Sequence, residues 1–196
     1  VGGLLIYFLP KNIQKHFAVT VSIIEALISF WAAYRFKSGT SGYQFIESHL
    51  WFRYINVHYA VGVDGLSLIL ILMTTIITPI VLIASWSDGD DGRFSPATFF
   101  FLLLTVESLA VAIFSATDIF YFYILFELVL IPVYFLIAGF GNGERTAAAT
   151  KFLMYGLFGG FVMLAGVIGL FYQAIKLGIP SFDVSALSQI HIPTAA

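Results

Sequence analysis

The chain has 196 residues, of which 60% are hydrophobic and only 10% are charged, and its mean hydropathy is +0.96. A soluble globule of this size has too little interior to bury so much apolar surface. The composition therefore excludes a soluble enzyme domain and indicates an integral membrane protein. Cysteine is absent, which excludes disulfides and thiolate-ligated clusters within the chain. The net charge is −2 without a basic stripe, so no nucleic-acid partner is predicted.

Charged residues divide the chain into apolar windows close to the ~20 residues that a helix needs to cross a bilayer. Lipid-facing strands are a poor alternative, because these windows are continuous and about twice as long as a ~10-residue barrel strand. We predict an all-α polytopic bundle of about six helices, forming a single membrane domain over 1–196. The predicted spans are 1–10 (partial, read as a truncated helix), 16–36, 65–86, 96–115, 118–140 and 150–174, followed by a loop or tail at 175–196. The other connections, including the long polar and aromatic stretch 37–64, are predicted to be loops.

Metal and nucleotide sites have little support in the sequence. The histidines are not spaced as ligands on one helix face, so a structural role is favoured over metal binding; they are His16, His49, His58 and His191. The segment GFGNG at 139–143 resembles a glycine-rich phosphate loop, but it follows a membrane helix rather than a strand and is predicted to be a turn. We predict no cofactor, metal or catalytic residue in this chain.

Two acids in the middle of predicted spans are the candidate functional residues. The turn near residue 117 lies ten residues from both Glu107 and Glu127, so each carboxyl is ~15 Å deep at 1.5 Å per residue. An ionisable group at that depth costs roughly 2.5–3.5 kcal/mol on insertion scales and usually belongs to an ion or proton path. If the two acids face each other, repulsion and desolvation would let them hold and release a proton.

Residues around Glu127 support this interpretation. Tyr123 and Tyr134 share its helix face and could hydrogen-bond it directly or through water. Pro132 has no N–H for the carbonyl of Leu128, so a carbonyl one residue past the acid is freed. An ordinary packing kink explains Pro132 equally well.

Other polar residues in or near the spans have competing explanations. Lys151 begins the last span ~12 Å from Glu127 along the helix axis, and it is either a proton-path residue or a lysine that reaches the interface. Glu25 is midspan without a partner that the sequence identifies. Asp64 and Asp118 have the position of helix N-caps. A stripe with small-xxx-small spacing predicts close helix packing: Gly156, Gly160, Ala165 and Gly169.

Three segments resemble a known family: VGVDGLSLILILMTT, ESLAVAIFSATDIFYFYILFELVLIPVYFLIAGFG and RTAAATKFLMYGLFGGFVMLAGVIGL. They look like the first half of the antiporter-like chain M (mitochondrial chain 4 type) of proton-pumping NADH:quinone oxidoreductase, respiratory complex I. Phe126 before the acid, and GGF after Lys151, are similar to actinobacterial versions. The family chain has about fourteen helices, so by this analogy the sequence is an N-terminal fragment.

The resemblance implies roles for several residues. Glu127 would be the essential carboxylate of a proton channel, paired with a lysine on a seventh helix beyond this sequence. Glu107 would be an accessory acid, and Lys151 would match a recurring lysine of the sixth helix. NADH, FMN, iron–sulfur clusters and quinone would bind other subunits, so the chain would be part of an enzyme without a redox centre of its own. The implied partners are the antiporter-like chains L and N and the lipid of a bacterial cell membrane.

Two other functions stay open at this point. In FELVLIPVYFLI the acid is followed by LIP and an aromatic residue, a pattern that favours chain M over chains L and N and over multisubunit sodium/proton antiporters. Those proteins share the membrane glutamate and resemble this chain less. The second alternative is a helical scaffold that does not transport, in which the buried acids are only paired.

Overall fold

The computed structural model describes residues 2–39, 42–53, 56–89, 93–178 and 181–188. Its short N-terminal elements are α1 (Gly2–Leu5) and the 3-10 turn η1 (Ile6–Phe8), and its C-terminal element is α7 (Val184–Leu187). Between them lie five long helices and two strands: α2 (Lys11–Arg35), β1 (Gln44–Phe52), β2 (Val57–Val63), α3 (Gly65–Ala84), α4 (Pro96–Ser115), α5 (Ile119–Phe140) and α6 (Arg145–Lys176).

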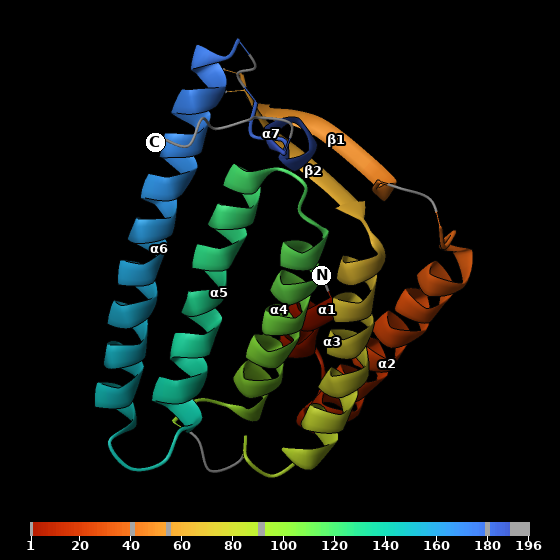
Figure 1. Ribbon diagram of the computed structural model, residues 1–196. Helices are drawn as coiled ribbons and strands as arrows, with labels where there is room; N and C mark the ends of the chain where they lie inside the picture. The colour runs from red at the N-terminus through yellow and green to blue at the C-terminus, as the bar shows by residue number, and fades with distance from the viewer. Residues whose placement is uncertain (1, 40–41, 54–55, 90–92, 179–180, 189–196) are drawn as a thin grey trace.

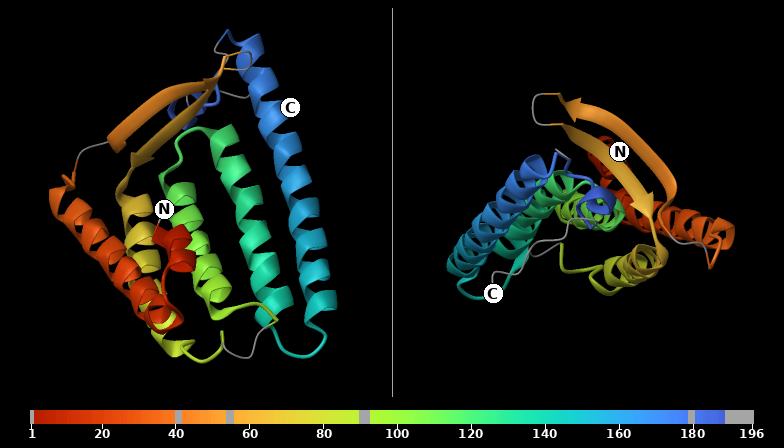
Figure 2. Two further views of the ribbon diagram at one scale, coloured as in Figure 1. Left: turned by 180° about the vertical axis from the view of Figure 1, so that it is seen from behind. Right: turned by 45° about the horizontal axis from the view of Figure 1, so that its top comes forward.

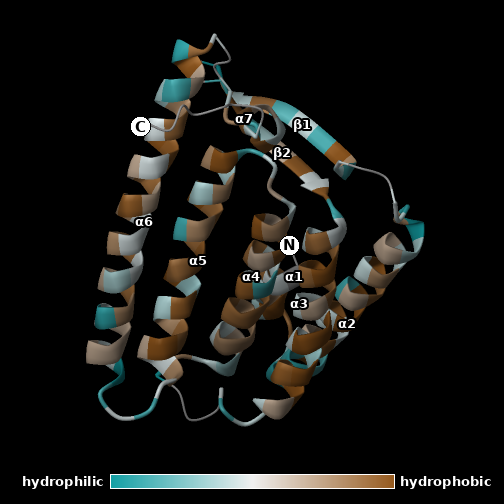
Figure 3. Cartoon of the chain, viewed as in Figure 1, coloured by the Kyte–Doolittle hydropathy of each residue, from teal (hydrophilic) through white to brown (hydrophobic). Residues whose placement is uncertain are grey.

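The five long helices, α2 to α6, are each long and apolar enough to cross a membrane. They stand side by side, with the polar residues mostly near their ends (Figures 1 and 3). The predicted helical bundle is therefore confirmed. Hydropathy locates apolar centres rather than helix ends, so α2 and α6 include polar residues outside the predicted spans. The segment predicted as the partial span 1–10 contains only α1 and η1, after which the chain is extended at Leu9 and Pro10.

Packing follows chain order except around α4. Consecutive long helices contact each other from α2 to α6, and α4 is also contacted by α2 and by the N-terminal elements α1 and η1. The face of α2 that is buried has small or polar side chains at helical spacing, which lets neighbouring helices approach closely: Gln14, Ala18, Ser22, Ala26 and Ser29. Large apolar side chains such as Phe100, Leu82 and Leu104 fill the core where α2, α3 and α4 meet.

The prediction that 37–64 is a loop is wrong for most of its length. Strands β1 and β2 pair antiparallel across it, with partners that include His49 with Tyr59 and Gln44 with Val63. The hairpin lies over one end of the bundle, outside the run of the helices (Figures 1 and 2). A two-stranded ribbon can have open edges there, because at the membrane surface they are exposed to water rather than to hydrocarbon.

Asp118 fastens the hairpin to the helical bundle. Its Oδ1 accepts hydrogen bonds from the N–H groups of Phe120 (2.9 Å) and Tyr121 (3.0 Å), which confirms the predicted N-cap. Its Oδ2 accepts from the N–H of His58 in β2 at 3.1 Å. The carboxylate is only 1% exposed, so these donors are its main stabilisation. The neighbouring Thr117 N–H donates to Ala60 of β2, which adds a second bond between the turn and the hairpin.

The C-terminal tail contacts the same turn. The N–H of Val184 donates to the carbonyl of Thr117, and the N–H of Ile119 donates to the carbonyl of Phe182. The described part of the tail thus covers the α4–α5 connection with the four-residue helix α7. His191, one of the four histidines, lies outside the described residues.

Replacing Asp118 by alanine removes an N-cap and leaves the buried His58 N–H without its acceptor. We expect a loss of unfolding free energy of about 2–3 kcal/mol, measured by denaturing-detergent unfolding of the full-length chain. Asp183→Ala is the matched control, because Asp183 caps only α7 and its loss should cost about 1 kcal/mol or less. Equal losses in both variants would contradict the role of Asp118 in holding the hairpin.

The Asp64 carboxylate caps α3, as the sequence predicts, and accepts from the Ser67 N–H (2.7 Å) and the Ser67 hydroxyl (2.8 Å). These hydrogen bonds hold the pKa of Asp64 below its usual value. Because the pKa of Asp64 is lower in the folded protein than in the unfolded chain, its ionised form stabilises the fold. This contribution to the free energy of unfolding is fully present above the unfolded pKa of about 3.9 and is lost as the pH falls through the pKa of the folded protein.

Thermal unfolding as a function of pH tests this cap. The melting temperature should fall below about pH 4, and Asp64→Asn, which cannot titrate, should remove part of that fall. Identical pH profiles for the two proteins would show that the cap contributes no pH dependence.

Candidate functional site

The Glu127 side chain projects from α5 onto α6 at Gly160. A Cβ atom at Gly160 would overlap Glu127 Oε1, so a larger residue at 160 would force the end of the Glu127 side chain to move. One turn earlier, a Cβ at Gly156 would lie 2.9 Å from the Leu130 side chain. The predicted small-residue packing is thus present at these two positions, whereas Gly169 borders open space.

The Glu127 side chain is half-buried. Its Oε1 atom is buried and has no hydrogen-bond partner among the described residues. Tyr123, one turn earlier on α5, interacts electrostatically with the carboxyl group, as the shared helix face predicts. Tyr134 packs edge-on against Phe135, and Pro132 is buried within a helix that continues past it. A carboxyl group in this setting is poised to hold a proton or to pair with a cation.

Lys151 lies on the exposed face of α6. Its side chain lines a groove together with Thr150, Met154 and Tyr155. Gly160 marks the level of Glu127 on this helix, and Lys151 precedes it by nine residues, or about 13 Å along the axis. The structure therefore places the lysine and the acid at different depths, close to the separation predicted from the sequence.

Glu107 does not face Glu127. Its carboxyl group points away from α5 and interacts with Glu25 of α2 and with Thr78 of α3. The side chain is only 2% exposed, and neither carboxyl oxygen has a hydrogen-bond partner among the described residues. The sequence predicted that the two acids would interact if they faced each other, but the rotation of α4 about its axis turns Glu107 toward Glu25 of α2.

Sequence reasoning therefore missed Glu25 as the neighbour of Glu107. A signal was present, because both acids are near the middle of their helices and Glu25 adjoins the small-residue face of α2 between Ser22 and Ser29. The missing information was that α2 packs against α4, two helices further along the chain.

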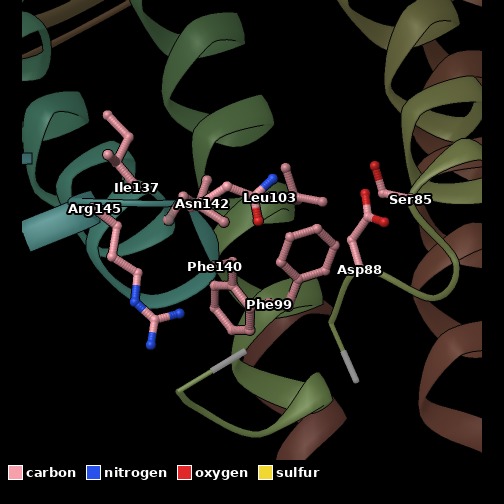
Figure 4. Close-up of a pocket in the computed structure, with 10 residues that line it drawn as sticks. Ser85, Asp88, Phe99, Leu103, Ile137, Phe140, Asn142 and Arg145 are labelled. Carbon is pink, nitrogen blue, oxygen red and sulfur yellow. The ribbon is translucent and has the colours of Figure 1, made fainter. Parts of the chain in front are cut away.

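A separate cavity of about 510 Å³ lies between the ends of α4 and α5 that are remote from the hairpin. Asp88 and Arg145 line it from opposite sides, with Phe99 and Phe140 between them (Figure 4). Leu103, one turn before Glu107, also borders it. The cavity does not reach Glu127 or Glu107. Within the described residues, no group of three or more His, Asp or Glu side chains could hold a metal ion.

Comparison with known proteins gives the family. Residues 4–114 match the family described as "NADH-ubiquinone oxidoreductase chain 4, amino terminus", which is more than half of the chain. The chain belongs to the chain 4 family of NADH-ubiquinone oxidoreductase. Residues 116–192 match a second family, described as "NADH:quinone oxidoreductase/Mrp antiporter, TM". The family assignment made from the sequence motifs is thereby confirmed.

Individual relatives agree with this assignment. NADH-quinone oxidoreductase subunit M of Mycobacterium tuberculosis H37Rv is 36% identical over 93% of this chain, which spans 38% of that relative. F420H2 dehydrogenase subunit M of Methanosarcina mazei is 35% identical over 90% of this chain and 35% of its own length. A chain of respiratory complex I from Thermus thermophilus superposes with a TM-score of 0.78 at 25% identity, covering 95% of this chain and 36% of that one. The chain thus spans just over a third of the relatives it matches.

The contact between Glu127 and Gly160 can be tested by a single methyl group. We expect Gly160→Ala in the full-length chain to displace the carboxyl group and to reduce proton transport several-fold, or to impair assembly. Gly159→Ala is the matched control, because a Cβ at Gly159 meets nothing within 4 Å. Proton transport per assembled complex should stay unchanged in that control, and similar behaviour of the two variants would contradict the contact.

Proposed function

We propose that this chain is part of the proton-translocating membrane subunit M of a bacterial NADH:quinone oxidoreductase. The observation that carries the proposal is the Glu127 carboxyl group, which lies midspan between α5 and α6 against Gly160. Intramembrane acids of this kind usually belong to ion or proton paths. Family membership supplies the wider context.

In this proposal Glu127 is the central proton-holding group and Tyr123 is its polar neighbour. Lys151, about 13 Å away along α6, connects to it through water and residues outside this chain rather than by a direct ion pair. Glu107 is an accessory acid on the far side of α4. Pro132 and Tyr134 have supporting roles, since Pro132 frees the carbonyl of Leu128 beside the acid and Tyr134 is seven residues past it on the same face.

Coupling to electron transfer is electrostatic in this proposal. Quinone reduction elsewhere in the complex changes the charge of a lysine partner of Glu127, supplied by the part of the protein that follows this chain. Such a change alters the proton affinity of the path by a few kcal/mol. NADH, FMN, iron–sulfur clusters and quinone bind other subunits, and chains L and N are the neighbours in the cell membrane. A related subunit M is named for an F420H2 dehydrogenase, so the electron donor is a property of other subunits.

A sodium/proton antiporter subunit is the second candidate. It is supported by the match of residues 116–192 to a family whose description includes Mrp antiporters. The chain 4 match over residues 4–114 favours the oxidoreductase. Sodium-dependent proton exchange without NADH would distinguish the antiporter.

NADH-driven acidification of inside-out vesicles that contain Glu127→Gln in the full-length chain is the decisive test. We expect acidification to fall at least about tenfold, because the amide cannot carry a proton between the two sides. Succinate-driven acidification should be unchanged, which controls for leaks. Glu47→Gln, which removes an exposed carboxylate of β1, is the matched control and should pump normally.

The other outcomes discriminate among the candidates. Normal NADH-driven acidification in Glu127→Gln would contradict a role in the proton path. Loss of the assembled complex without loss of pumping per complex would indicate a scaffold. Sodium sensitivity that changes while NADH-driven pumping does not would favour the antiporter.

A further inference from the structure

Three acids lie in the membrane-spanning helices. One of them, Glu127, contacts α6 and belongs to the proton path proposed above. The other two meet on the opposite side of the bundle. Glu107 of α4 and Glu25 of α2 are close enough to interact electrostatically and to form a side-chain hydrogen bond when one of them carries a proton. We propose that Glu25 and Glu107 form a second proton-binding site, in which the two carboxyl groups share one proton between α2, α3 and α4.

The first argument is that the side chains beside the Glu107 carboxyl group are those of Glu25 and Thr78. Both of its oxygens are buried and without partners, as noted above. The hydroxyl group of Thr78 lies beside it, but donates its proton to the carbonyl of Thr74 at 2.9 Å. Thr75 likewise donates to the carbonyl of Ile71 at 3.1 Å. A fully desolvated carboxylate without hydrogen-bond donors is strongly unfavourable. A proton shared with Glu25 supplies the hydrogen bond that the neighbouring hydroxyl groups do not give to Glu107.

The second argument is that no cation faces the pair among the described residues. The basic groups of α2 lie near its two ends, at least nine residues from Glu25, or about 13 Å or more along the axis; they are Lys11, Lys15, His16 and Arg35. Helices α3 and α4 carry no other charged residue. Glu127 on α5 points to α6. Two adjacent carboxyl groups in such a setting do not both ionise, and they titrate as a unit.

The third argument is access for water. A groove of about 270 Å³ is lined by Glu25 and by three hydroxyl-bearing residues from α2, α3 and α4: Ser29, Thr75 and Ser108. It also borders Val111, one turn past Glu107 toward the hairpin. On the other side, Leu103 borders the cavity of about 510 Å³. The groove thus gives Glu25 a space large enough for water, and the cavity at the opposite end of α4 stops one turn short of Glu107.

The ligand of this site is a proton rather than a metal ion. Glu107 offers unpartnered oxygens, and the hydroxyl beside it, on Thr78, donates to a carbonyl of its own helix. A sodium ion prefers several converging oxygens, and two carboxyl groups alone are a poor shell for it. Proton sharing needs only the two carboxyl groups. The role of this site as a branch of the proton path rests on the proposed function. The binding of a proton by Glu25 and Glu107 does not rest on it.

Infrared spectroscopy of the assembled membrane complex with the full-length chain tests the site directly, without NADH and without any measurement of pumping. The probe is the C=O stretching band of a protonated carboxyl group, followed as the pH is raised. We expect Glu107→Gln to remove one such band. Glu25→Gln should make that band disappear at a pH lower by about one unit or more, because the repulsion from the second carboxyl group is removed.

Glu47→Gln, on the exposed face of β1, is the matched control and should leave the band and its pH dependence unchanged. If Glu107→Gln does not assemble, Glu25→Gln alone decides, because Glu25 is only half-buried at the groove. A band that is unaffected by both substitutions would overturn the proposal. Loss of the band on addition of sodium chloride, but not of choline chloride, would overturn it in favour of a cation site. Failure of the Glu127 pumping test would leave these spectra unchanged, so the two proposals fail independently.

Discussion

The arrangement of this bundle depends on the need to keep carboxyl groups out of lipid. A charge at the bilayer centre is unfavourable by several kcal/mol unless protein, water or a proton compensates for it. The chain has three such groups, Glu25, Glu107 and Glu127, and each points toward another helix. Small residues stand where the acids need space. Gly160 makes room for Glu127 on α6, and the small polar face of α2 adjoins Glu25 and brings it to Glu107.

Glu127 and the pair Glu25–Glu107 differ in what surrounds their carboxyl groups. Glu127 stands alone against a glycine backbone with a tyrosine nearby, so its protonation responds to any charge that approaches from outside α5 and α6. Glu107 is enclosed, and among the described residues its acidic neighbour is Glu25, so the protonation of each carboxyl group in this pair depends mainly on the other. A lone acid suits a relay that a moving charge controls, whereas a coupled pair suits a site that buffers one proton.

Sequence reasoning gave the helices correctly because every backbone group in hydrocarbon must be paired within its own segment, which leaves a long apolar helix as the solution. The stripe of Tyr123 with Glu127 followed from helical spacing, and the caps at Asp64 and Asp118 followed from local chemistry. The hairpin was missed because strand pairing at the surface depends on partners five to nineteen residues away rather than on hydropathy. The direction of Glu107 was missed because depth fixes the level of a residue but not the rotation of its helix.

Negative charges at Glu107 and Glu127 would repel each other although the side chains do not touch. The two carboxyl groups lie on sides of the adjacent helices α4 and α5 that face away from each other, so their separation is roughly 15–20 Å for helices packed 8–10 Å apart. Two unit charges at that distance interact by about 1 kcal/mol at an effective dielectric constant of ~20, which changes a protonation equilibrium several-fold. Proton loss from one site therefore makes proton retention at the other more favourable. No side chain has to move for this coupling, since the turn at Asp118 already fixes the two helices to each other and to the hairpin.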